Sequence, residues 1–368
     1  MDRDLISVHK MKRIGILTLP IGMNVGGTLQ AFALNTVLHD MGYEVETINN
    51  KLNDAKVSML MRAYRGFTEF FQRKFIKDHI ILGKQKMYTH QDFCKIKDYY
   101  DAIIVGSDQV WRKGCTDECL YDYFLEFAGL NCHKIAYAAS FGISYWEYDE
   151  DERRRMCELV KSFDAISVRE ITGVELCDKY LSRKSVHVLD PTLLLSKDTY
   201  VSLCKKRLGK KKLFAYILDE SEDKKKIVAD CSKVLGLDIC LYEERKKIKN
   251  LFLLKDLNLT HYMFPSVSEW LTRFVEADIV VTDSFHGIVF SIILNKQFIA
   301  IANNDRGLAR VESLLGKFSL CDRMVNCYSD YSGRIWKTID FIPVNEILQS
   351  EREKSFDFLK NALKCLYK

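Results

Sequence analysis

Short apolar runs alternate along the chain with longer segments of helical periodicity, and this alternation predicts a parallel α/β sheet. Apolar runs typical of buried strands occur at 14–19, 102–105, 134–139 and 165–168, and again at 213–218, 278–281 and 297–302. Between them, segments with an apolar stripe of helical period lie at 28–41, 149–161, 223–235 and 266–277. In such sheets, ligands bind beyond the carboxyl ends of the strands, where the connecting loops begin.

The repeated pattern predicts two Rossmann-like α/β domains that face each other across a cleft. We place the N-terminal domain at 1–185, the C-terminal domain at 186–340 and a closing helix at 341–368. A chain of 368 residues has the length expected for two domains with separate cores. The segment 51–97 is basic, aromatic and helical in character, and the pattern does not fix its place in the fold.

The closing helix is amphipathic, because apolar residues line one side of it and charged residues the other. The apolar positions are Leu348, Phe356, Leu359, Leu363 and Leu366. We expect this face to pack back onto the protein. The alternative is a peripheral contact with a membrane, which the basic residues Lys360, Lys364 and Lys368 would favour.

Composition and charge narrow the classes of protein. A net charge of +5 is too small and too dispersed to predict nucleic-acid binding. No stretch of 18 apolar residues occurs and the first residues lack a signal-peptide core, so we expect a cytoplasmic protein. The twelve cysteines are scattered, and the only cluster, Cys115, Cys119, Cys132 and His133, lacks the paired spacing of a zinc site. We therefore predict no metal.

The segment 277–287 carries the most informative polar residues. An apolar strand ends in a turn that contains Ser284, Phe285, His286 and Gly287, and an apolar helix follows. This order predicts that His286 lies at a helix start in the ligand crevice, where Gly287 allows close backbone approach. The alternative is a loop histidine without a role.

Two further strand ends offer groups that suit a sugar. The glycine-containing loop 24–30 carries Asn24 and Gln30, whose amides can hydrogen-bond hydroxyls. The segment 106–111 places Asp108 and Gln109 beside Trp111. An aromatic ring beside hydrogen-bonding groups suits a sugar, but a buried structural Asp–Trp corner fits the same residues equally well.

Arginines follow two other predicted strands. Arg169 comes directly after 165–168, where a guanidinium favours bidentate capture of phosphate or carboxylate. An ion pair with Glu170 or Glu175 is the alternative. Arg306 and Arg310 follow the strand 297–302 and add positive charge on the side of His286.

Together these residues carry a resemblance to a known family. The chain resembles the polysaccharide pyruvyl transferases over about residues 14–326. The resemblance implies a GT-B-like fold and transfer of the enolpyruvyl-derived group of phosphoenolpyruvate onto a sugar as a cyclic ketal, with release of phosphate. The matching segments are 24–33, 105–111, 138–142, 167–170, 189–192 and 282–287.

The family's T-x-R-x-H-G motif, whose arginine and histidine contact phosphoenolpyruvate, assigns donor-binding residues. His286 matches the histidine, whereas Ser284 stands where the arginine is often found, so we expect Arg306 or Arg310 to replace it. Arg169 matches the family's other donor-binding arginine. The predicted donor site is Arg169, Ser284, Phe285, His286, Arg306 and Arg310, and the predicted acceptor site is Asn24, Gln30, Gln109 and Trp111.

The chemistry of phosphoenolpyruvate suggests two catalytic residues. Protonation at C3 leaves positive charge at C2, which a sugar hydroxyl attacks. His286 is the expected acid, because a group that titrates near neutrality serves best, and Asp108 is expected to orient or deprotonate the acceptor hydroxyl. Since arginines can neutralise the leaving phosphate, we expect no metal and no cofactor beyond the donor.

Two other classes share the predicted architecture. A GT-B glycosyltransferase that uses a nucleotide sugar would bind a nucleotide diphosphate instead of phosphoenolpyruvate. A non-catalytic glycan-binding protein would keep its ligand without Arg169 and His286. For a pyruvyl transferase, a galactose-type residue on a lipid-linked oligosaccharide is the expected acceptor, and it would hold the protein at the inner face of the cytoplasmic membrane.

Overall fold

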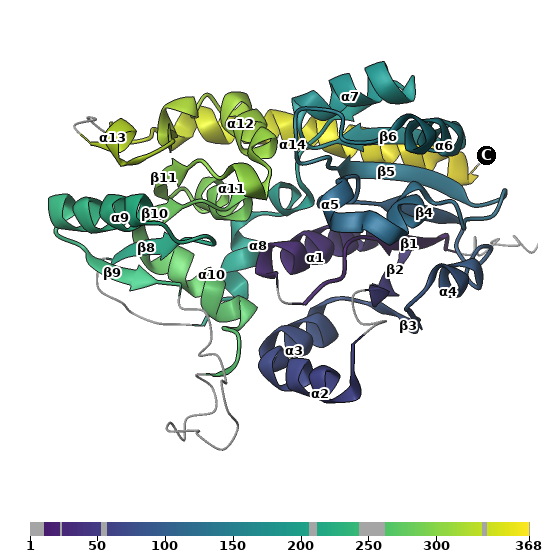
Figure 1. Cartoon of the computed structure of the whole chain (residues 1–368), viewed down its shortest axis with the longest axis horizontal. Helices are drawn as coiled ribbons and strands as arrows, with labels where there is room; N and C mark the ends of the chain where they lie inside the picture. Colours follow the sequence, from purple (N-terminus) through teal and green to yellow (C-terminus); the bar gives the residue numbers. More distant parts are fainter. Residues whose placement is uncertain are drawn as a thin grey trace, which may run out of the picture.

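The protein consists of two parallel α/β sheets that lie side by side, each covered by helices (Figure 1). The computed structural model describes residues 11–22, 24–52, 57–205, 212–242, 262–332 and 337–367. None of the helices in these ranges is both long and apolar enough to cross a membrane.

Seven described strands form the first sheet in the order β3-β2-β1-β4-β5-β6-β7, all parallel. They are β1 (Arg13–Leu17), β2 (Glu44–Asn50), β3 (Leu82–Met87), β4 (Ala102–Val105), β5 (His133–Ala139), β6 (Ala165–Val168) and β7 (Val186–His187). The helices around it are α1 (Val25–Asp40), α2 (Met59–Thr68), α3 (Phe70–His79), α4 (His90–Cys94), α5 (Lys113–Thr116), α6 (Glu150–Val160) and α7 (Ile171–Leu181).

Five described strands form the second sheet in the order β12-β11-β10-β8-β9, again parallel. They are β8 (Lys212–Tyr216), β9 (Asp238–Leu241), β10 (Ala277–Thr282), β11 (Gln297–Ile301) and β12 (Met324–Val325). The helices are α8 (Lys197–Ser202), α9 (Glu222–Leu235), α10 (Val267–Glu276), α11 (Phe285–Ile293), α12 (Leu308–Lys317), α13 (Tyr328–Tyr331) and α14 (Phe341–Leu363). The chain changes sheet between β7 and β8, so the predicted boundary at 185/186 falls immediately before the last strand of the first sheet.

The segment 51–97 is not wholly helical. It contains α2 and α3, but its second part forms the edge strand β3. Lys84, Gln85 and Lys86 of this strand are exposed. Edge strands commonly carry charged residues, which discourage pairing with other chains, and the apolar run that marks a central strand is therefore missing.

The closing helix α14 spans both halves (Figure 1). Leu348, Leu359 and Leu363 are buried, and Arg352 donates hydrogen bonds to the carbonyls of Leu193 and Leu195. The expected packing of this helix onto the protein is confirmed. Its apolar face is not available to a membrane, so the alternative drawn from that face is wrong.

Candidate functional site

Five charged or titratable residues from both halves meet in one buried cluster, which we call the interdomain cluster: Asp108, Arg169, Asp190, His286 and Arg310. Asp108, Arg169 and Asp190 follow β4, β6 and β7 of the first sheet, while His286 and Arg310 lie in the first turns of α11 and α12. All five are at most 6% exposed. The carboxyl ends of the strands therefore meet where the predicted cleft should be.

Arg169 is the centre of the interdomain cluster. Its guanidinium donates one hydrogen bond of 2.7 Å to Asp190 Oδ2 and another of 3.0 Å to Asp108 Oδ1. Burial by itself would lower the pKa of Arg169, but the two carboxylates outweigh it and raise that pKa above its ordinary value. The predicted alternative, an ion pair with Glu170 or Glu175, is not what the structure shows.

Arg310 brings a second guanidinium to the same carboxylate, with Nη1 3.9 Å from Asp108 Oδ1. The Phe285 ring lies beneath both arginines, with its centroid 4.8 Å from Cζ of Arg169 and 5.1 Å from Cζ of Arg310. Burial lowers the pKa of Arg310 to about 10, and repulsion from Arg169 lowers it too, so the group stays charged at neutral pH. Two cations held this close favour an anionic ligand.

Asp108 is the counterion that these arginines share. Burial would raise the pKa of its carboxyl, but Arg169 and Arg310 hold that pKa below its ordinary value. Asp108 also has a left-handed backbone, with φ 77°, and its Oδ1 accepts a hydrogen bond from the Gln109 amide. A carboxylate stabilised in this way is a weak base, so orienting a hydroxyl suits it better than deprotonating one.

His286 lies against Asp190, with Nε2 3.9 Å from Oδ2, and Nε2 is buried without a hydrogen-bond partner in the described part of the chain. Burial lowers the pKa of His286 to about 4, against the opposing pull of Asp190. In the ligand-free protein the imidazole is therefore neutral at neutral pH. An unsatisfied buried nitrogen calls for an explanation, and a ligand at this helix start would supply one.

The buried histidines should make stability depend on pH. His187 resembles His286 in that burial lowers its pKa to about 4. The unfolded chain binds these protons near the ordinary value of 6.5, so between that pH and about 4 it binds more protons than the folded chain. Stability is fully present above pH 6.5 and should fall with pH through this window, by up to about 1.4 kcal/mol per pH unit for each histidine.

Urea unfolding at a series of pH values would measure this slope. The variant His286→Gln should remove about half of it. His39→Gln, whose side chain is 65% exposed, should leave the slope unchanged. A slope that is the same in the His286 variant and in the parent protein would contradict the prediction.

Gly26, in the first turn of α1, leaves the room that His286 occupies. A Cβ at Gly26 would lie 2.2 Å from Nδ1 of His286 and 2.3 Å from its Cγ. Gly26→Ala should therefore displace the imidazole, and this would lower about 100-fold a turnover that depends on this histidine, because catalysis tolerates little misplacement. Initial-rate kinetics would measure the loss, and Gly66→Ala, which adds a methyl where nothing lies within 4 Å, is the matched control. Equal rates in the two variants would contradict the prediction.

Two residues of this site were not predicted from the sequence. Asp190 is fully enclosed, caps the helical turn at 191–194 through Thr192 and accepts a hydrogen bond from Ser107. Glu170 is also buried, and its Oε1 accepts hydrogen bonds from Ser140 Oγ and from the Phe141 and Gly142 amides. The Asp-Pro-Thr segment was a signal for Asp190, because a carboxylate before such a turn commonly caps it.

The two arginines predicted as substitutes for the missing one lie in different places. Arg310 belongs to the interdomain cluster. Arg306 instead forms a two-point ion pair with Asp219, at 2.8 and 2.7 Å, and its side chain is 51% exposed. Ser284 is buried and caps α11 by accepting a hydrogen bond from the Gly287 amide.

Of the predicted acceptor residues, Trp111 has no exposed surface. Its indole donates to the Tyr123 carbonyl and stacks on Phe124 at 5.0 Å between centroids, so no ring face is open to a sugar. The prediction of a sugar-stacking role is wrong for this structure, and the alternative of a structural corner describes it. Burial of this large aromatic ring in the core stabilises the fold.

The other three predicted acceptor-binding residues differ in how many of their hydrogen-bonding groups are already used within the protein. Gln30 is buried and bonds Thr18 Oγ1, the Gly27 carbonyl and the Ser107 amide, so its hydrogen-bonding groups hold the loop that carries Asp108. Gln109 is partly buried and accepts from Arg112. Asn24 is exposed and caps α1 through its oxygen, which leaves its amide nitrogen for a ligand.

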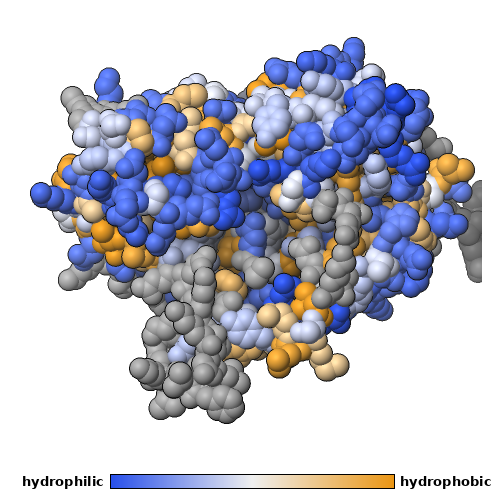
Figure 2. Space-filling view, viewed as in Figure 1, coloured by the Kyte–Doolittle hydropathy of each residue, from blue (hydrophilic) through white to orange (hydrophobic). Residues whose placement is uncertain are grey.

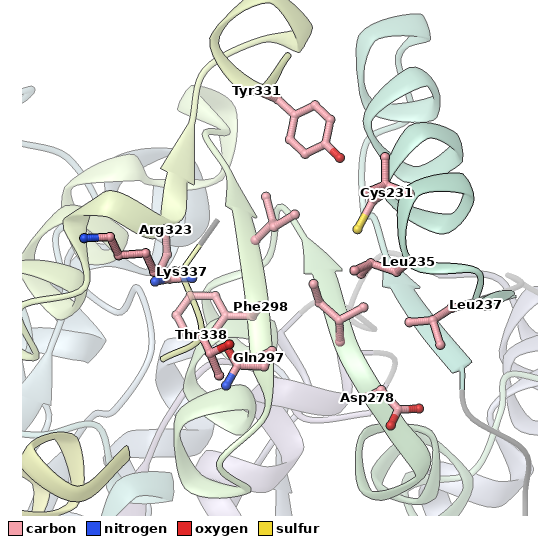
Figure 3. Close-up of a pocket in the computed structure, with 13 residues that line it drawn as sticks. Cys231, Leu235, Leu237, Asp278, Gln297, Phe298, Arg323, Tyr331, Lys337 and Thr338 are labelled. Carbon is pink, nitrogen blue, oxygen red and sulfur yellow. The ribbon is translucent and has the colours of Figure 1, made fainter. Parts of the chain in front are cut away.

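Other hollows and clusters lie away from this site. A hollow of about 530 Å³ opens beside α9 and α13, where Cys231, Phe298 and Tyr331 line it (Figure 3). Its residues Asp278 and Gln297 lie at the amino ends of β10 and β11, opposite the end that carries His286. This is the end of a parallel sheet where ligands are not expected.

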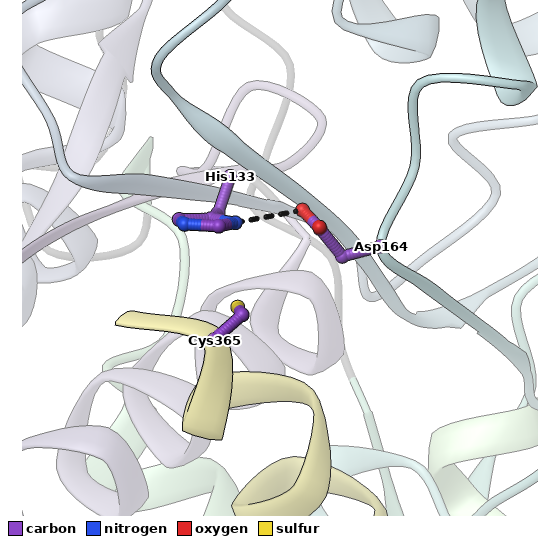
Figure 4. Close-up of side chains that lie close together, drawn as sticks. All are labelled: His133, Asp164 and Cys365. Atoms are coloured by element: carbon purple, nitrogen blue, oxygen red, sulfur yellow. Dashed lines mark hydrogen bonds and ion pairs between the residues drawn. The ribbon is translucent and has the colours of Figure 1, made fainter. Parts of the chain in front are cut away.

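One group in the described ranges could hold a metal ion, and it shares only His133 with the cysteine cluster, for which the sequence predicts no metal. His133 Nδ1 lies 3.1 Å from Asp164 Oδ2, and Cys365 is close to both (Figure 4). Three ligand atoms fall short of the four of a structural zinc site. His133 begins β5, at the amino end of the sheet, so the group is remote from the interdomain cluster.

Comparison with solved structures gives the fold. The chain is similar to a candidate UDP-N-acetylglucosamine 2-epimerase from Listeria monocytogenes, at 10% identity over 92% of this chain and 95% of that one, with a TM-score of 0.50. The UDP-GlcNAc 2-epimerase from Methanocaldococcus jannaschii matches at 12% identity over 93% and 92%, with a TM-score of 0.49. The architecture is GT-B-like, with two Rossmann-like domains, as predicted.

The family is given by a different comparison. A search of curated proteins finds no match. The sequence pattern of the polysaccharide pyruvyl transferase family matches residues 24–305, most of the chain, and this range contains all of the interdomain cluster except Arg310. The chain therefore belongs to the polysaccharide pyruvyl transferase family.

Proposed function

We propose that this transferase moves the enolpyruvyl-derived group of phosphoenolpyruvate onto two hydroxyls of a sugar as a cyclic ketal and releases phosphate. The observation that carries the proposal is the buried pair of guanidiniums, Arg169 and Arg310, beside a histidine whose Nε2 lacks a partner among the described residues. A galactose-type residue in a lipid-linked polysaccharide precursor is the proposed acceptor.

The charges of the interdomain cluster suit a donor with two anionic groups. In the ligand-free protein Arg169 and Arg310 are balanced by Asp108 and Asp190. The phosphate and carboxylate of the donor would compete with Asp108 for the two guanidiniums. They would also accept hydrogen bonds from backbone N–H groups at the start of α11. Because the residues are buried, entry requires the two halves to separate.

His286 is the proposed acid, and the incoming donor supplies the reason for its protonation. Its pKa of about 4 rises when negative charge is placed beside it, so the imidazole gains a proton on donor binding. The imidazolium gives this proton to C3, and a sugar hydroxyl attacks the positive C2. The C2–O bond to phosphate breaks, the second hydroxyl bonds to C2, and the two hydroxyl protons leave to His286 and to phosphate.

Asp108 is the proposed orienting group for the acceptor. When the donor displaces Asp108 from the two arginines, the Asp108 carboxylate is free to accept a hydrogen bond from a sugar hydroxyl. Asn24 caps α1 through its side-chain oxygen, and its amide nitrogen is a further proposed contact with the acceptor sugar. Neither role calls for a metal, since two arginines offset the charge of the leaving phosphate.

The function is tested by phosphate release from phosphoenolpyruvate with and without aryl β-galactoside or lipid-linked acceptors. Mass spectrometry of the acceptor should show the gain of one pyruvate ketal. Release that depends on an acceptor supports the proposal. Binding of a nucleotide diphosphate, with no binding of phosphoenolpyruvate, would instead support a glycosyltransferase.

The donor site makes a specific prediction for two arginines. Arg310→Gln should weaken phosphoenolpyruvate binding about 10-fold or more, because a buried charge-assisted contact is lost. Arg306→Gln should change it less than about threefold, because its partner is the exposed Asp219. Calorimetric titration with the donor measures both. Equal weakening in the two variants would remove Arg310 from the proposed site.

A further inference from the structure

The helix pair α2–α3 presents an apolar tip to solvent. Met59 is 87% exposed, Leu60 83% and Met61 47%, and Phe70 at the start of α3 is 51% exposed. Figure 1 shows the pair projecting from the body of the protein, and Figure 2 shows hydrophobic residues gathered in the same place. Neighbouring exposed side chains of this size commonly mark a contact surface.

The other side of the pair is fixed to the protein. Phe75 and Ile76 are buried in the main core. Gln72 donates a hydrogen bond of 2.6 Å to the Pro265 carbonyl, and the Phe264 amide donates one of 2.8 Å to the Thr68 carbonyl. The helices are therefore anchored across to the second half, and the tip is not a loose segment whose apolar residues belong to the core.

The same helix pair carries a net positive charge, although Arg73 is paired with Glu69 and Lys74 with Asp78. The segment 59–79 holds five arginines and lysines against Glu69 and Asp78, so its net charge is 5 − 2 = +3, while the whole chain carries +5. Lys74 and Lys77 are exposed. Beside α3 the charge continues into a groove of about 640 Å³, whose lining includes Lys51, Arg73, Lys77 and Lys86 with Glu69 and Asp78.

We propose that α2–α3 docks the protein on an anionic phospholipid surface. Exposed apolar groups on the same helix pair as exposed basic side chains are typical of helices that lie at a membrane interface, where the apolar groups enter the acyl boundary and the cations contact lipid phosphates. The proposal concerns attachment and is independent of the proposed chemistry.

Flotation of the full chain with lipid vesicles tests the proposal, and flotation keeps aggregates out of the bound fraction. Vesicles with about one third phosphatidylglycerol should bind the protein at least fivefold more than pure phosphatidylcholine vesicles. Met59→Ser with Leu60→Ser should lower binding about 10-fold. Lys74→Glu with Lys77→Glu should abolish the preference for anionic vesicles.

Matched variants elsewhere separate the proposed surface from general stickiness. Leu130→Ser removes a fully exposed leucine outside the pair, and Lys233→Glu reverses an exposed charge on α9. Both should bind like the parent protein. Equal binding to anionic and neutral vesicles, no binding at all, or losses as large in these controls as in the α2–α3 variants would overturn the proposal. None of these outcomes depends on enzymatic activity.

Discussion

Replacing His286 with glutamine should lower pyruvyl transfer by about 10²- to 10⁴-fold, the range that general acid catalysis contributes. Glutamine fills similar space and can hydrogen-bond, but it cannot deliver a proton. His286 Nε2 is one of the buried atoms without a hydrogen-bond partner in the described ranges, so the atom proposed to transfer the proton is open to a ligand. Acceptor-dependent phosphate release measures the loss.

Two further measurements make this result specific. Donor binding should persist in the His286 variant within about 10-fold, because the arginines remain, whereas a folding defect would remove binding as well. The control is His90→Gln. His90 lies on α4 and pairs with Asp122, and this variant should keep full activity. Turnover of the His286 variant within about threefold of the parent would exclude the proposed role.

Replacing Arg169 with methionine should cost about 3–5 kcal/mol of folding free energy, because it leaves the buried Asp190 without its arginine and Asp108 with only the more distant Arg310. The side chains of Arg169 and Asp190 have no exposed surface, and the side chain of Asp108 is only 9% exposed. Each carboxylate would have to be desolvated alone or take up a proton. Denaturant unfolding followed by tryptophan fluorescence measures the loss.

An exposed ion pair in the second half of the protein provides the comparison. Arg306→Met breaks the exposed pair with Asp219 and should cost less than about 1 kcal/mol. Adding Asp108→Asn and Asp190→Asn to Arg169→Met should restore much of the stability, because the uncompensated charges are then gone. A loss below about 1 kcal/mol in Arg169→Met would show that the carboxylates find other partners.

The central strands of the two sheets were predictable, because burial on both faces requires continuous apolar runs. Those at 102–105 and 165–168 match β4 and β6 residue for residue, and the turn after 278–281 was found from its polar residues. The edge strand β3 was not predicted, because its central residues Lys84, Gln85 and Lys86 are exposed and polar and no continuous apolar run marks it. Helix α1 begins at Val25, three residues earlier than predicted, because Asn24 caps it before the glycines.

The polar residues of the site were located well and their roles less well. Strand ends at 108, 169 and 286 carry the residues that meet, and local pattern was enough to find them. Which groups pair is a matter of distance between segments far apart in the chain. Arg169 could pair with Glu170 by proximity in sequence, but it pairs with Asp108 and Asp190, 61 and 21 residues away.

The sequence by itself determined the two parallel α/β domains, the family motifs and the strand ends that bear charge, because periodicity and turn chemistry act over a few residues. Only the tertiary structure decided that Arg310 and not Arg306 joins His286, that Trp111 is core and that Asp190 completes the interdomain cluster. It also set the pKa of His286 at about 4. These features depend on burial and on charges that folding brings together, and the local sequence predicts neither of them.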